Sequence, residues 1–574
     1  MNARSRERGA GSGLDRAALG LILLLGAIVL VVEARGLTFS GDDWTVLLDR
    51  RGHDLSVFFD PHSGQLVAGP IFVFKVLLQV FGASSYWPFI LTSLAVHLLV
   101  SLLVWMLASQ AVGPRLALVP AAVVVLLGPA WQDLLWAFQL GYFGSVAAGL
   151  GAYLMVARDE RRADVAACLL LAVSLLFGSM GLGVAAGIAV ELLLRRRDGS
   201  AEPARWTLSG SHWRRLWVAV VPVVLYLVWR AASGATNDGA NDLTTIPGYV
   251  ADALAAGLAS ITGLGHTPAD ASPYVVSLDW GRPLALALVA LIALRFVRRA
   301  PLTPRTWAYM TTLVVVWAAA AWSYIPAREA FQSRYQYVSA VFLLLTVAEL
   351  ARGWRPSVRA GWVLTGATAF AVVANVGILR DGADFWRMNS EHVAAETGAL
   401  EIARAVVDPA FAPEDESTAA AIGVHNMQPV VAGSYLSATD DFGSPADSPA
   451  EIADRPAAVR AAADFVLARA ERLGLAPVER LPRAGATCRT VSPTGGVVEQ
   501  QLAPGTTALR AAGDGPVQVR LRRFGDDYGL VSFPELTGGA AGALTIPADG
   551  APDRPWRLQA TTGGPLRLCT QPAG

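Results

Sequence analysis

The sequence predicts an α-helical membrane protein with about eleven transmembrane helices and a soluble C-terminal α+β domain. Hydrophobic residues make up 53% of the 574 positions, charged residues only 16%, and the mean hydropathy is +0.43. This balance is typical of polytopic membrane proteins. Apolar runs recur up to residue 380, and the composition after that point changes to a soluble type. The net charge of +0 gives no reason to expect a nucleic-acid partner.

The first predicted span covers residues 17–34. Arginines precede it, and no small-residue cleavage site follows, so we interpret it as a transmembrane helix and not as a signal peptide. Its 18 residues, at about 1.5 Å each, are long enough to cross a bilayer core. The positive-inside rule then places the N-terminus in the cytoplasm.

An acidic pair, Asp42 and Asp43, lies in the predicted outer loop 35–66, within the stretch Phe-Ser-Gly-Asp-Asp-Trp. Ionisable residues at membrane depth are costly and indicate a functional site, although an acid pair that caps a helix is a structural alternative. We predict that both aspartates are catalytic. Trp44, His53 and His62 of the same loop are candidate substrate-binding residues.

Residues 64–81 are apolar but interrupted by Pro70 and Lys75, which favours an amphipathic helix in the membrane interface. This helix completes an outer segment that covers residues 35–85. The next span, 86–110, contains His97, for which we favour an interhelical hydrogen bond over a catalytic role.

Spans 116–130 and 140–157 are joined by a short outer loop, 131–139, that is rich in indole and amide groups. Its Trp131, Gln132 and Asp133 are candidate substrate-binding residues. Two alternatives stay open, because indole rings either stack on a sugar or anchor a protein at the membrane interface.

The distribution of arginine decides the remaining spans. A single span over 165–194 would place the arginines between 195 and 215 outside, so we predict two helices that divide near residues 177–181. For the same reason the apolar stretch 249–264 is predicted to lie in the interface. The other predicted spans are 216–232, 283–297, 307–323, 337–350 and 361–379. An odd total of eleven leaves the C-terminus outside.

The last outer loop, residues 324–337, carries Arg328, Arg334 and Tyr335. A guanidinium offers a planar fork to phosphate oxygens, so this loop suits a lipid-linked phosphate. In the alternative, Arg328 pairs with Glu329 and Arg334 reaches lipid headgroups. We favour phosphate binding.

Three domains are predicted: a transmembrane domain over 1–380, a mostly helical segment over 381–484, and a β-sandwich-like domain over 485–574. Residues 384–407 and 450–474 have helical apolar periodicity, and short alternating strands follow residue 485. Cys488 and Cys569 bracket the strands, so an oxidising outer compartment permits a disulfide between them. Two buried free thiols are the alternative.

This order of elements resembles the C-type (GT-C) integral membrane glycosyltransferases, of the actinobacterial kind. The sharpest motif is Gly41-Asp42-Asp43-Trp44. The resemblance implies that Asp42 or Asp43 acts at the catalytic centre and that the donor is a polyprenyl-phosphate-linked sugar. Some members carry Asp-x-Asp with a divalent metal. This chain has adjacent aspartates instead, so a metal is left undecided.

The predicted function is glycosyl transfer at the outer face of the plasma membrane, with a cell-envelope glycan or protein as acceptor and inversion as the implied stereochemistry. A carboxylate would deprotonate the acceptor hydroxyl, and the lipid phosphate would leave into a basic site. The alternative is a non-catalytic lipid-linked glycan transporter or a scaffold for envelope assembly. A transporter should have broken helices with polar groups at mid-membrane, whereas here the polar residues gather at the outer mouth.

Overall fold

The computed structural model describes residues 3–195, 213–236, 239, 242–267, 274–298, 302–325, 328–413, 430–481, 486–513 and 515–572, with side chains from residue 13 onward. The chain divides into two compact units. Unit 1 consists of Met1–Arg35, Gly52–Leu77 and Trp87–Trp386, and unit 2 consists of Gly36–Arg51, Leu78–Tyr86 and Arg387–Gly574. The acidic pair therefore belongs to unit 2, a division that the predicted domain boundary at residue 380 did not anticipate.

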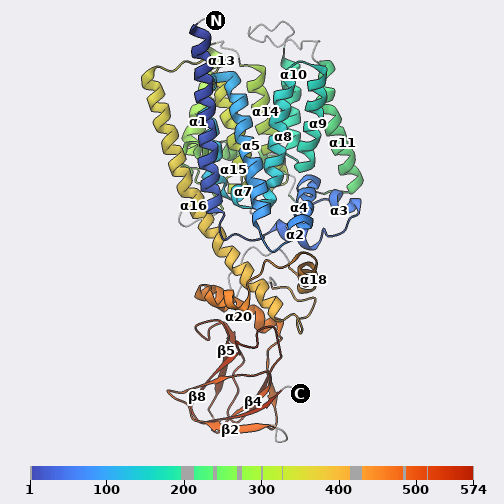
Figure 1. The fold of residues 1–574 in the computed structure, drawn as a ribbon, viewed down its shortest axis with the longest axis vertical. Coiled ribbons are helices and arrows are strands. Elements are labelled where there is room, and N and C mark those ends of the chain that lie inside the picture. The colour runs from blue at the N-terminus through green and yellow to red at the C-terminus, as the bar shows by residue number, and fades with distance from the viewer. Residues whose placement is uncertain are drawn as a thin grey trace. The chain divides into compact units, whose positions relative to one another are not determined.

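Unit 1 is a bundle of helices (Figure 1). In it α8 packs on α5 and α9, α10 packs on α14, and α15 packs on α5, α12 and α14. The helices are α1 (Ala3–Glu33), α3 (Leu55–Phe59), most of α4 (Ala68–Phe81), α5 (Trp87–Val112), α6 (Leu118–Val125), α7 (Trp131–Leu135), α8 (Leu140–Val156), α9 (Arg161–Phe177), α10 (Gly181–Leu194), α11 (Trp217–Ser233), α12 (Ile246–Thr262), α13 (Gly281–Val297), α14 (Pro304–Trp322), α15 (Ser333–Leu350) and the first part of α16 (Val358–Ile402).

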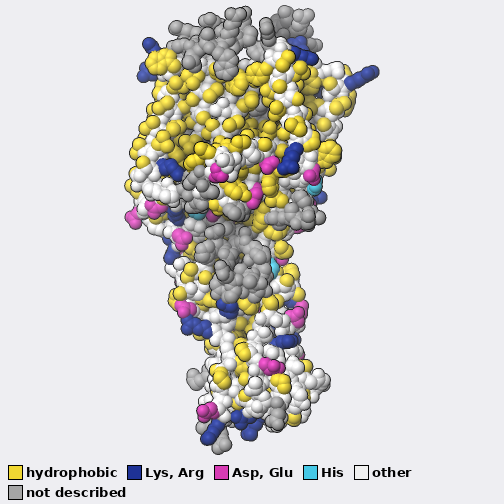
Figure 2. Space-filling model, turned by 180° about the vertical axis from the view of Figure 1, so that it is seen from behind, with side chains coloured by type: hydrophobic (Ala, Val, Ile, Leu, Met, Phe, Trp, Pro, Cys, Tyr) yellow, Lys and Arg dark blue, Asp and Glu magenta, His cyan; other side chains and the backbone are white. Residues whose placement is uncertain are grey.

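The outer helices of unit 1 expose large apolar side chains, such as Leu225 on α11, Leu286 on α13 and Val363 on α16. Figure 2 shows a broad band of apolar side chains over this unit. Helices satisfy their own backbone hydrogen bonds, so an apolar helical surface of this kind suits a bilayer. Unit 1 is a membrane unit.

Among the described residues, four helices are long and apolar enough to cross a membrane, or five if the bent pair α6 and α7 counts as one span. This is fewer than the predicted eleven, because several predicted spans are short helices. For example, α8 and α9 have 17 residues each and α10 has 14.

The predicted division of 165–194 into two helices is confirmed. Helix α9 ends at Phe177 and α10 begins at Gly181. The Phe177 ring then lies over α8, where a Cβ at Gly144 would come within 2.2 Å of it. The break is therefore stabilised by a side chain that only a glycine can accommodate.

Helix α12 lies across one end of the bundle. The ring of Tyr249, near its start, is 6.5 Å from that of Tyr324, just after α14. Ser260, near its end, donates a hydrogen bond of 3.4 Å to Gln336 in the first turn of α15. Both ends of α12 thus contact residues at the same end of the bundle, and the interfacial position of residues 249–264 stays a prediction. The helix is nevertheless more buried than an interfacial helix would be.

Two predictions about local structure were wrong. Residues 131–139 are not an exposed outer loop but the buried helix α7 and the 3-10 turn η2 (Ala137–Gln139). The predicted helices 361–379 and 384–407 are one continuous helix, α16. Gly382 does not interrupt it, because the Trp131 ring occupies the place of the missing side chain, 2.3 Å from where a Cβ would lie.

Unit 2 contains two antiparallel sheets in its described part, as predicted, with strand orders β1-β7-β4-β9-β2 and β3-β8-β5-β6. Inward residues alternate with exposed ones, as in β5, where Val517, Val519 and Leu521 are buried. Helices α2 (Asp42–Leu48), α18 (Ala432–Phe442), α19 (Pro449–Asp454), α20 (Ala457–Ala470) and the end of α16 complete the unit. The strands are β1 (Leu475–Val478), β2 (Thr487–Val491), β3 (Val497–Gln501), β4 (Gly505–Ala511), β5 (Val517–Arg522), β6 (Val531–Ser532), β7 (Ala541–Ile546), β8 (Arg557–Thr562) and β9 (Leu566–Pro572).

A disulfide joins Cys488 and Cys569, which face each other on β2 and β9 and are separated by 81 positions. Closing a loop of this length should stabilise the fold by about 4 kcal/mol through the entropy of the unfolded chain. Replacing both cysteines by serine should therefore weaken hydrogen-exchange protection of β2 and β9 in the full-length protein. Cys168→Ser, at a half-buried free thiol of α9, is the control. Equal protection in both variants would contradict a stabilising role.

Buried carboxylates join α20 and the turn after it to the sheets. Asp464 accepts hydrogen bonds from the backbone N–H groups of Arg523, Phe524 and Gly525 at 2.8, 2.8 and 2.9 Å. Glu471 accepts from Trp556 Nε1 at 3.0 Å. Burial raises the pKa of Asp464 to about 6 and that of Glu471 to about 9, the latter with a further contribution from neighbouring Asp549.

The raised pKa of Glu471 predicts that unit 2 is less stable at alkaline pH. A carboxyl whose pKa is higher in the folded state contributes stability below its unfolded pKa of 4.5 and loses it as pH rises towards 9. Glu471→Gln should remove this loss. The difference in melting temperature between this variant and the natural protein should therefore increase as the pH rises from 6 to 9. Thermal scans of the full-length protein measure this, with exposed Glu499→Gln as control. Parallel pH profiles for all three proteins would refute the assignment.

Candidate functional site

The acidic pair opens the short helix α2 in unit 2. Asp43 is buried, with 1% of its surface exposed, and its Oδ2 accepts hydrogen bonds from the Ser40 N–H at 3.1 Å and the Tyr86 hydroxyl at 3.2 Å. Asp42 is half-buried in the first turn of the same helix. Carboxylates are favourable at this position because the helix dipole is positive there. Asp43 thus has a structural role whatever else it does.

Trp44 packs inside unit 2. Its ring centroid lies 6.0 Å from that of Phe39 and 5.8 Å from that of Tyr435. Nearby, the Arg51 side chain donates to Asp441 at 2.9 Å, and the Ala83 N–H donates to the Phe442 carbonyl at 2.7 Å. The acidic segment is therefore held by α18, and the buried Trp44 ring has no open face for a sugar.

The two histidines of the predicted outer loop belong to unit 1. His53 is exposed, and the half-buried His62 ring contacts Phe138 at 5.5 Å between centroids. They do not share a unit with the acidic pair.

A second carboxylate, Asp133 on α7, is fully buried in unit 1, with 0% of its surface exposed. Neither carboxylate oxygen has a hydrogen-bond partner among the residues that the structure describes. The opposing charge that acts on it is the guanidinium of Arg334. Buried carboxylates are normally hydrogen-bonded, so an unsatisfied one indicates a ligand site.

Backbone and side-chain contacts bring α7 and the start of α15 together. The Gln132 N–H donates to Ser333 Oγ at 3.2 Å, and the Arg334 N–H donates to Gln132 Oε1 at 3.3 Å. The Ser333 N–H donates to the Tyr274 carbonyl at 2.6 Å. These bonds explain why Gln132 and Arg334, about two hundred positions apart, meet.

A cavity of about 110 Å³ lies at this end of the bundle. Half-buried Arg328 and Tyr335 line it, and the Arg334 guanidinium lies 5.3 Å from the centre of the Tyr335 ring. The Tyr249 hydroxyl is buried at the wall without a partner among the described residues. Gln65, Tyr142, Ser179 and Ser323 are also polar, whereas Met180, Val316, Trp317, Ala319, Ala320, Ala330 and Val338 make the remaining wall mostly apolar.

The structure thus brings together Gln132, Asp133 and Arg334, with Arg328 and Tyr335 at the cavity. Trp131 is close in sequence but only 2% exposed, and its ring stacks on Tyr274 at 5.6 Å and 23°. The Trp131 ring therefore neither stacks on a sugar nor anchors the protein at the membrane interface, because it packs inside the protein. Tyr142, Tyr249 and Gln332 were not predicted. A tyrosine in an otherwise apolar helix was the available signal for Tyr142 and Tyr249, and Gln332 had no such signal.

His97 makes the interhelical hydrogen bonds predicted for it. Its Nδ1 lies 2.8 Å from the Tyr337 hydroxyl, and its Nε2 lies 3.2 Å from the Val125 carbonyl. Since a carbonyl only accepts, Nε2 carries the proton and Nδ1 accepts from the tyrosine. Both ring nitrogens of His97 are therefore hydrogen-bonded, as expected for a residue with a structural role.

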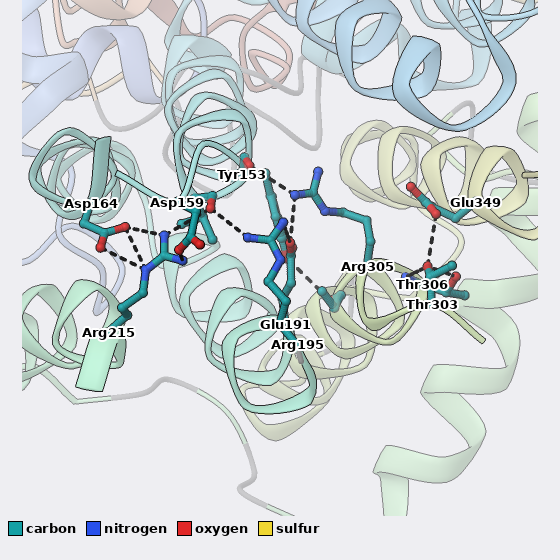
Figure 3. A network of polar contacts seen from close by, with 12 residues as sticks. Tyr153, Asp159, Asp164, Glu191, Arg195, Arg215, Thr303, Arg305, Thr306 and Glu349 are labelled. Atoms are coloured by element: carbon teal, nitrogen blue, oxygen red, sulfur yellow. Dashed lines mark hydrogen bonds and ion pairs between the residues drawn. The ribbon is translucent and has the colours of Figure 1, made fainter. Parts of the chain in front are cut away.

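The opposite end of the same helices is closed by buried ion pairs (Figure 3). Glu191 on α10 accepts from Arg305 at the start of α14 at 2.8 Å. Arg215 donates to Asp164 on α9 at 2.9 Å and to the Val156 carbonyl at the end of α8 at 3.1 Å. The cavity is lined by the start of α8, the end of α14 and the start of α15, so the two sites are about one helix length apart.

Metal ligation was left undecided from sequence. Among the described residues, no group of three or more His, Cys, Asp or Glu side chains could hold a metal ion.

Comparison with known proteins gives no family model that matches this chain and no curated protein that matches it. Solved structures with some similarity include the apo oligosaccharyltransferase of Archaeoglobus fulgidus, at 14% identity and a TM-score of 0.38 over 67% of this chain. Another is arabinosyltransferase EmbB of Mycobacterium smegmatis, at 13% identity and a TM-score of 0.30 over 96% of this chain. The matches cover 58% and 64% of those two chains, respectively.

Proposed function

We propose that this chain is a membrane glycosyltransferase that transfers a sugar from a polyprenyl-phosphate donor to a cell-envelope glycan or protein acceptor. One observation carries the proposal. Asp133 is a buried carboxylate, neither of whose oxygens has a hydrogen-bond partner among the described residues, and it lies near Arg334 and a cavity that Arg328 lines. A carboxylate and a guanidinium are the two charges that transfer from a lipid phosphate requires.

The roles follow from the chemistry of each group. Arg328 and Arg334 bind the phosphate, because the guanidinium fork stabilises the charge that develops as the phosphate leaves. The apolar wall of Val316, Ala319 and Ala320 suits the first part of a prenyl chain. Asp133 accepts hydrogen bonds from the donor sugar and stabilises the positive charge of the sugar ring in the transition state. The sequence-based prediction that Asp42 or Asp43 is the general base for the acceptor hydroxyl is tested separately, because both aspartates belong to unit 2.

Topology supports an outward-facing site. Arg195, Arg215 and Arg305 gather at the end of unit 1 that carries the buried ion pairs. The positive-inside rule would place that end in the cytoplasm and the cavity at the outer face. This agrees with the predicted cytoplasmic N-terminus, because α1 belongs to unit 1.

The transporter alternative receives less support. Alternating access would require the end shown in Figure 3 to open, and breaking a buried ion pair such as Glu191 with Arg305 costs about 3–5 kcal/mol. The scaffold alternative gives no reason for a buried carboxylate that has no hydrogen-bond partner among the described residues, near a cavity that Arg328 lines.

The test is sugar transfer by the purified protein in lipid nanodiscs. Radiolabelled undecaprenyl-phosphate sugars are supplied one at a time with envelope extracts as acceptors, and label is followed into the non-lipid product. Transfer from at least one donor supports the proposal. Movement of intact lipid-linked sugar across a vesicle membrane without transfer would instead favour a transporter.

A further inference from the structure

We propose that Gln65 and Ser179 form a recognition site for the sugar of the donor, in which the side-chain amide of Gln65 donates a hydrogen bond to a sugar hydroxyl. The inference rests on the proposed function, because it assigns the sugar end of the donor to one wall of the cavity. Neither residue was a predicted site residue.

The two residues come from separate segments of unit 1 and line the cavity together. Ser179 Oγ donates a hydrogen bond to Gln65 Oε1 at 3.0 Å. This bond orients the amide and uses its oxygen, whereas Gln65 Nε2 makes no hydrogen bond to any residue that the structure describes. Because a side-chain amide nitrogen carries two N–H donors, Gln65 offers a donor that an oxygen of a ligand can accept.

The turn before α4 holds Gln65 in place. The His62 N–H donates to the Gln65 carbonyl at 3.0 Å, and the Gln65 N–H donates to the His62 carbonyl at 2.9 Å. Arg230, near the end of α11, donates to the Gly64 carbonyl at 3.0 Å. These bonds fix the backbone from which the amide side chain extends.

The break between α9 and α10 holds Ser179 in place. Its carbonyl accepts a hydrogen bond from the Leu182 N–H, in the first turn of α10, at 3.0 Å. The Phe177 ring packs over Gly69 on α4, where a Cβ would come within 2.5 Å of it. Gly69 lies four positions after Gln65, so this ring packs the break against the segment that carries the glutamine. The hydrogen bond between Gln65 and Ser179 is therefore supported by the packing of both segments.

The uncharged polar groups of the cavity suit a sugar. The Tyr249 hydroxyl is buried and has no hydrogen-bond partner among the described residues, so a polar ligand is expected to supply one. Tyr142 and Ser323 add further hydroxyl groups to the wall, and Trp317 adds an indole ring. Sugar hydroxyls both donate and accept hydrogen bonds, and the apolar faces of a sugar ring pack on aromatic rings. Because an amide carries no charge to offset that of a phosphate, Gln65 suits the sugar end of the donor.

The experiment compares lipid binding by the full-length protein and its variants in nanodiscs, with native mass spectrometry as the measurement. The probes are undecaprenyl phosphates that carry glucose, mannose or arabinose, and undecaprenyl phosphate without a sugar is the reference lipid. The natural protein should bind at least one of the probes more tightly than the reference lipid. Gln65→Met keeps the length of the side chain and removes the amide. It should weaken binding of the preferred probe about fivefold and leave the reference lipid unchanged.

Two further variants complete the experiment. Ser179→Ala should act in the same direction with a smaller loss, because the amide remains but is no longer oriented by the serine hydroxyl. Gln110→Met, at an exposed glutamine of α5, is the matched control and should behave as the natural protein does.

The outcomes separate this inference from the proposed function. If the natural protein prefers a sugar-bearing probe but transfers no sugar, the transferase assignment fails and the recognition site stands. If no probe binds more tightly than the reference lipid, the recognition site is overturned. It is also overturned if Gln65→Met binds the preferred probe as tightly as the natural protein does, or loses affinity for the probe and the reference lipid equally. Should Gln65→Met fail to fold, Gln65→Asn decides, because its shorter amide should lose the preference as well. An unchanged preference in that variant would contradict the inference.

Discussion

Replacing Asp133 by asparagine should lower sugar transfer by about a hundredfold or more, the usual cost of losing one electrostatic group that stabilises a transition state. The substitution keeps the shape of the side chain and removes its ability to ionise. The melting temperature should stay the same or rise, because both oxygens are buried without a partner among the described residues and an unsatisfied buried carboxylate destabilises a fold.

Transfer assays and thermal scans on the same preparation measure the two effects together. Asp279→Asn is the matched control, because this aspartate is exposed in the loop before α13, where its Oδ2 accepts a hydrogen bond from the nearby Ser277 hydroxyl at 2.8 Å. Loss of both activity and stability would indicate a structural Asp133. Full activity would remove the residue from the proposed site.

The second large effect should differ between the two aspartates of the acidic pair. Asp42→Asn should lower turnover about a hundredfold, as expected when a general base is lost. Asp43→Asn should also destabilise unit 2, because Oδ2 of Asp43 accepts from the Ser40 N–H and the Tyr86 hydroxyl. Disturbing such a buried acceptor costs about 1–3 kcal/mol.

Tyr86→Phe separates these effects, since it removes one partner of Asp43 and leaves both carboxylates in place. It should reproduce part of the stability loss and keep most of the turnover. If Asp42→Asn and Asp43→Asn, singly and together, gave folded and fully active protein, neither aspartate would be the base. Turnover with the preferred donor and melting temperature are the two measurements.

The sequence alone determined most of the helices of unit 1 and the sheets of unit 2, because apolar periodicity and turn residues act over short distances. The break between α9 and α10 followed from charge, since one long span would have placed arginines on the wrong side. The same local signals marked Arg328, Arg334 and Tyr335 as a group, because they lie within a few residues of each other.

Only the tertiary structure decided which of these groups share a unit. Asp42, Asp43 and Trp44 belong to unit 2 because α18 and Tyr86 hold their segment, whereas Asp133 meets Arg334 in unit 1 through the bonds of Gln132. No local pattern reports a contact between positions two hundred residues apart. The roles of Trp131 and Asp133 also differ, although the two residues are only two positions apart. Trp131 fills a gap beside Gly382, whereas the oxygens of Asp133 are buried without a partner among the described residues. Neighbouring residues of one predicted loop thus differ in role, because packing and hydrogen bonding are set by segments distant in the chain.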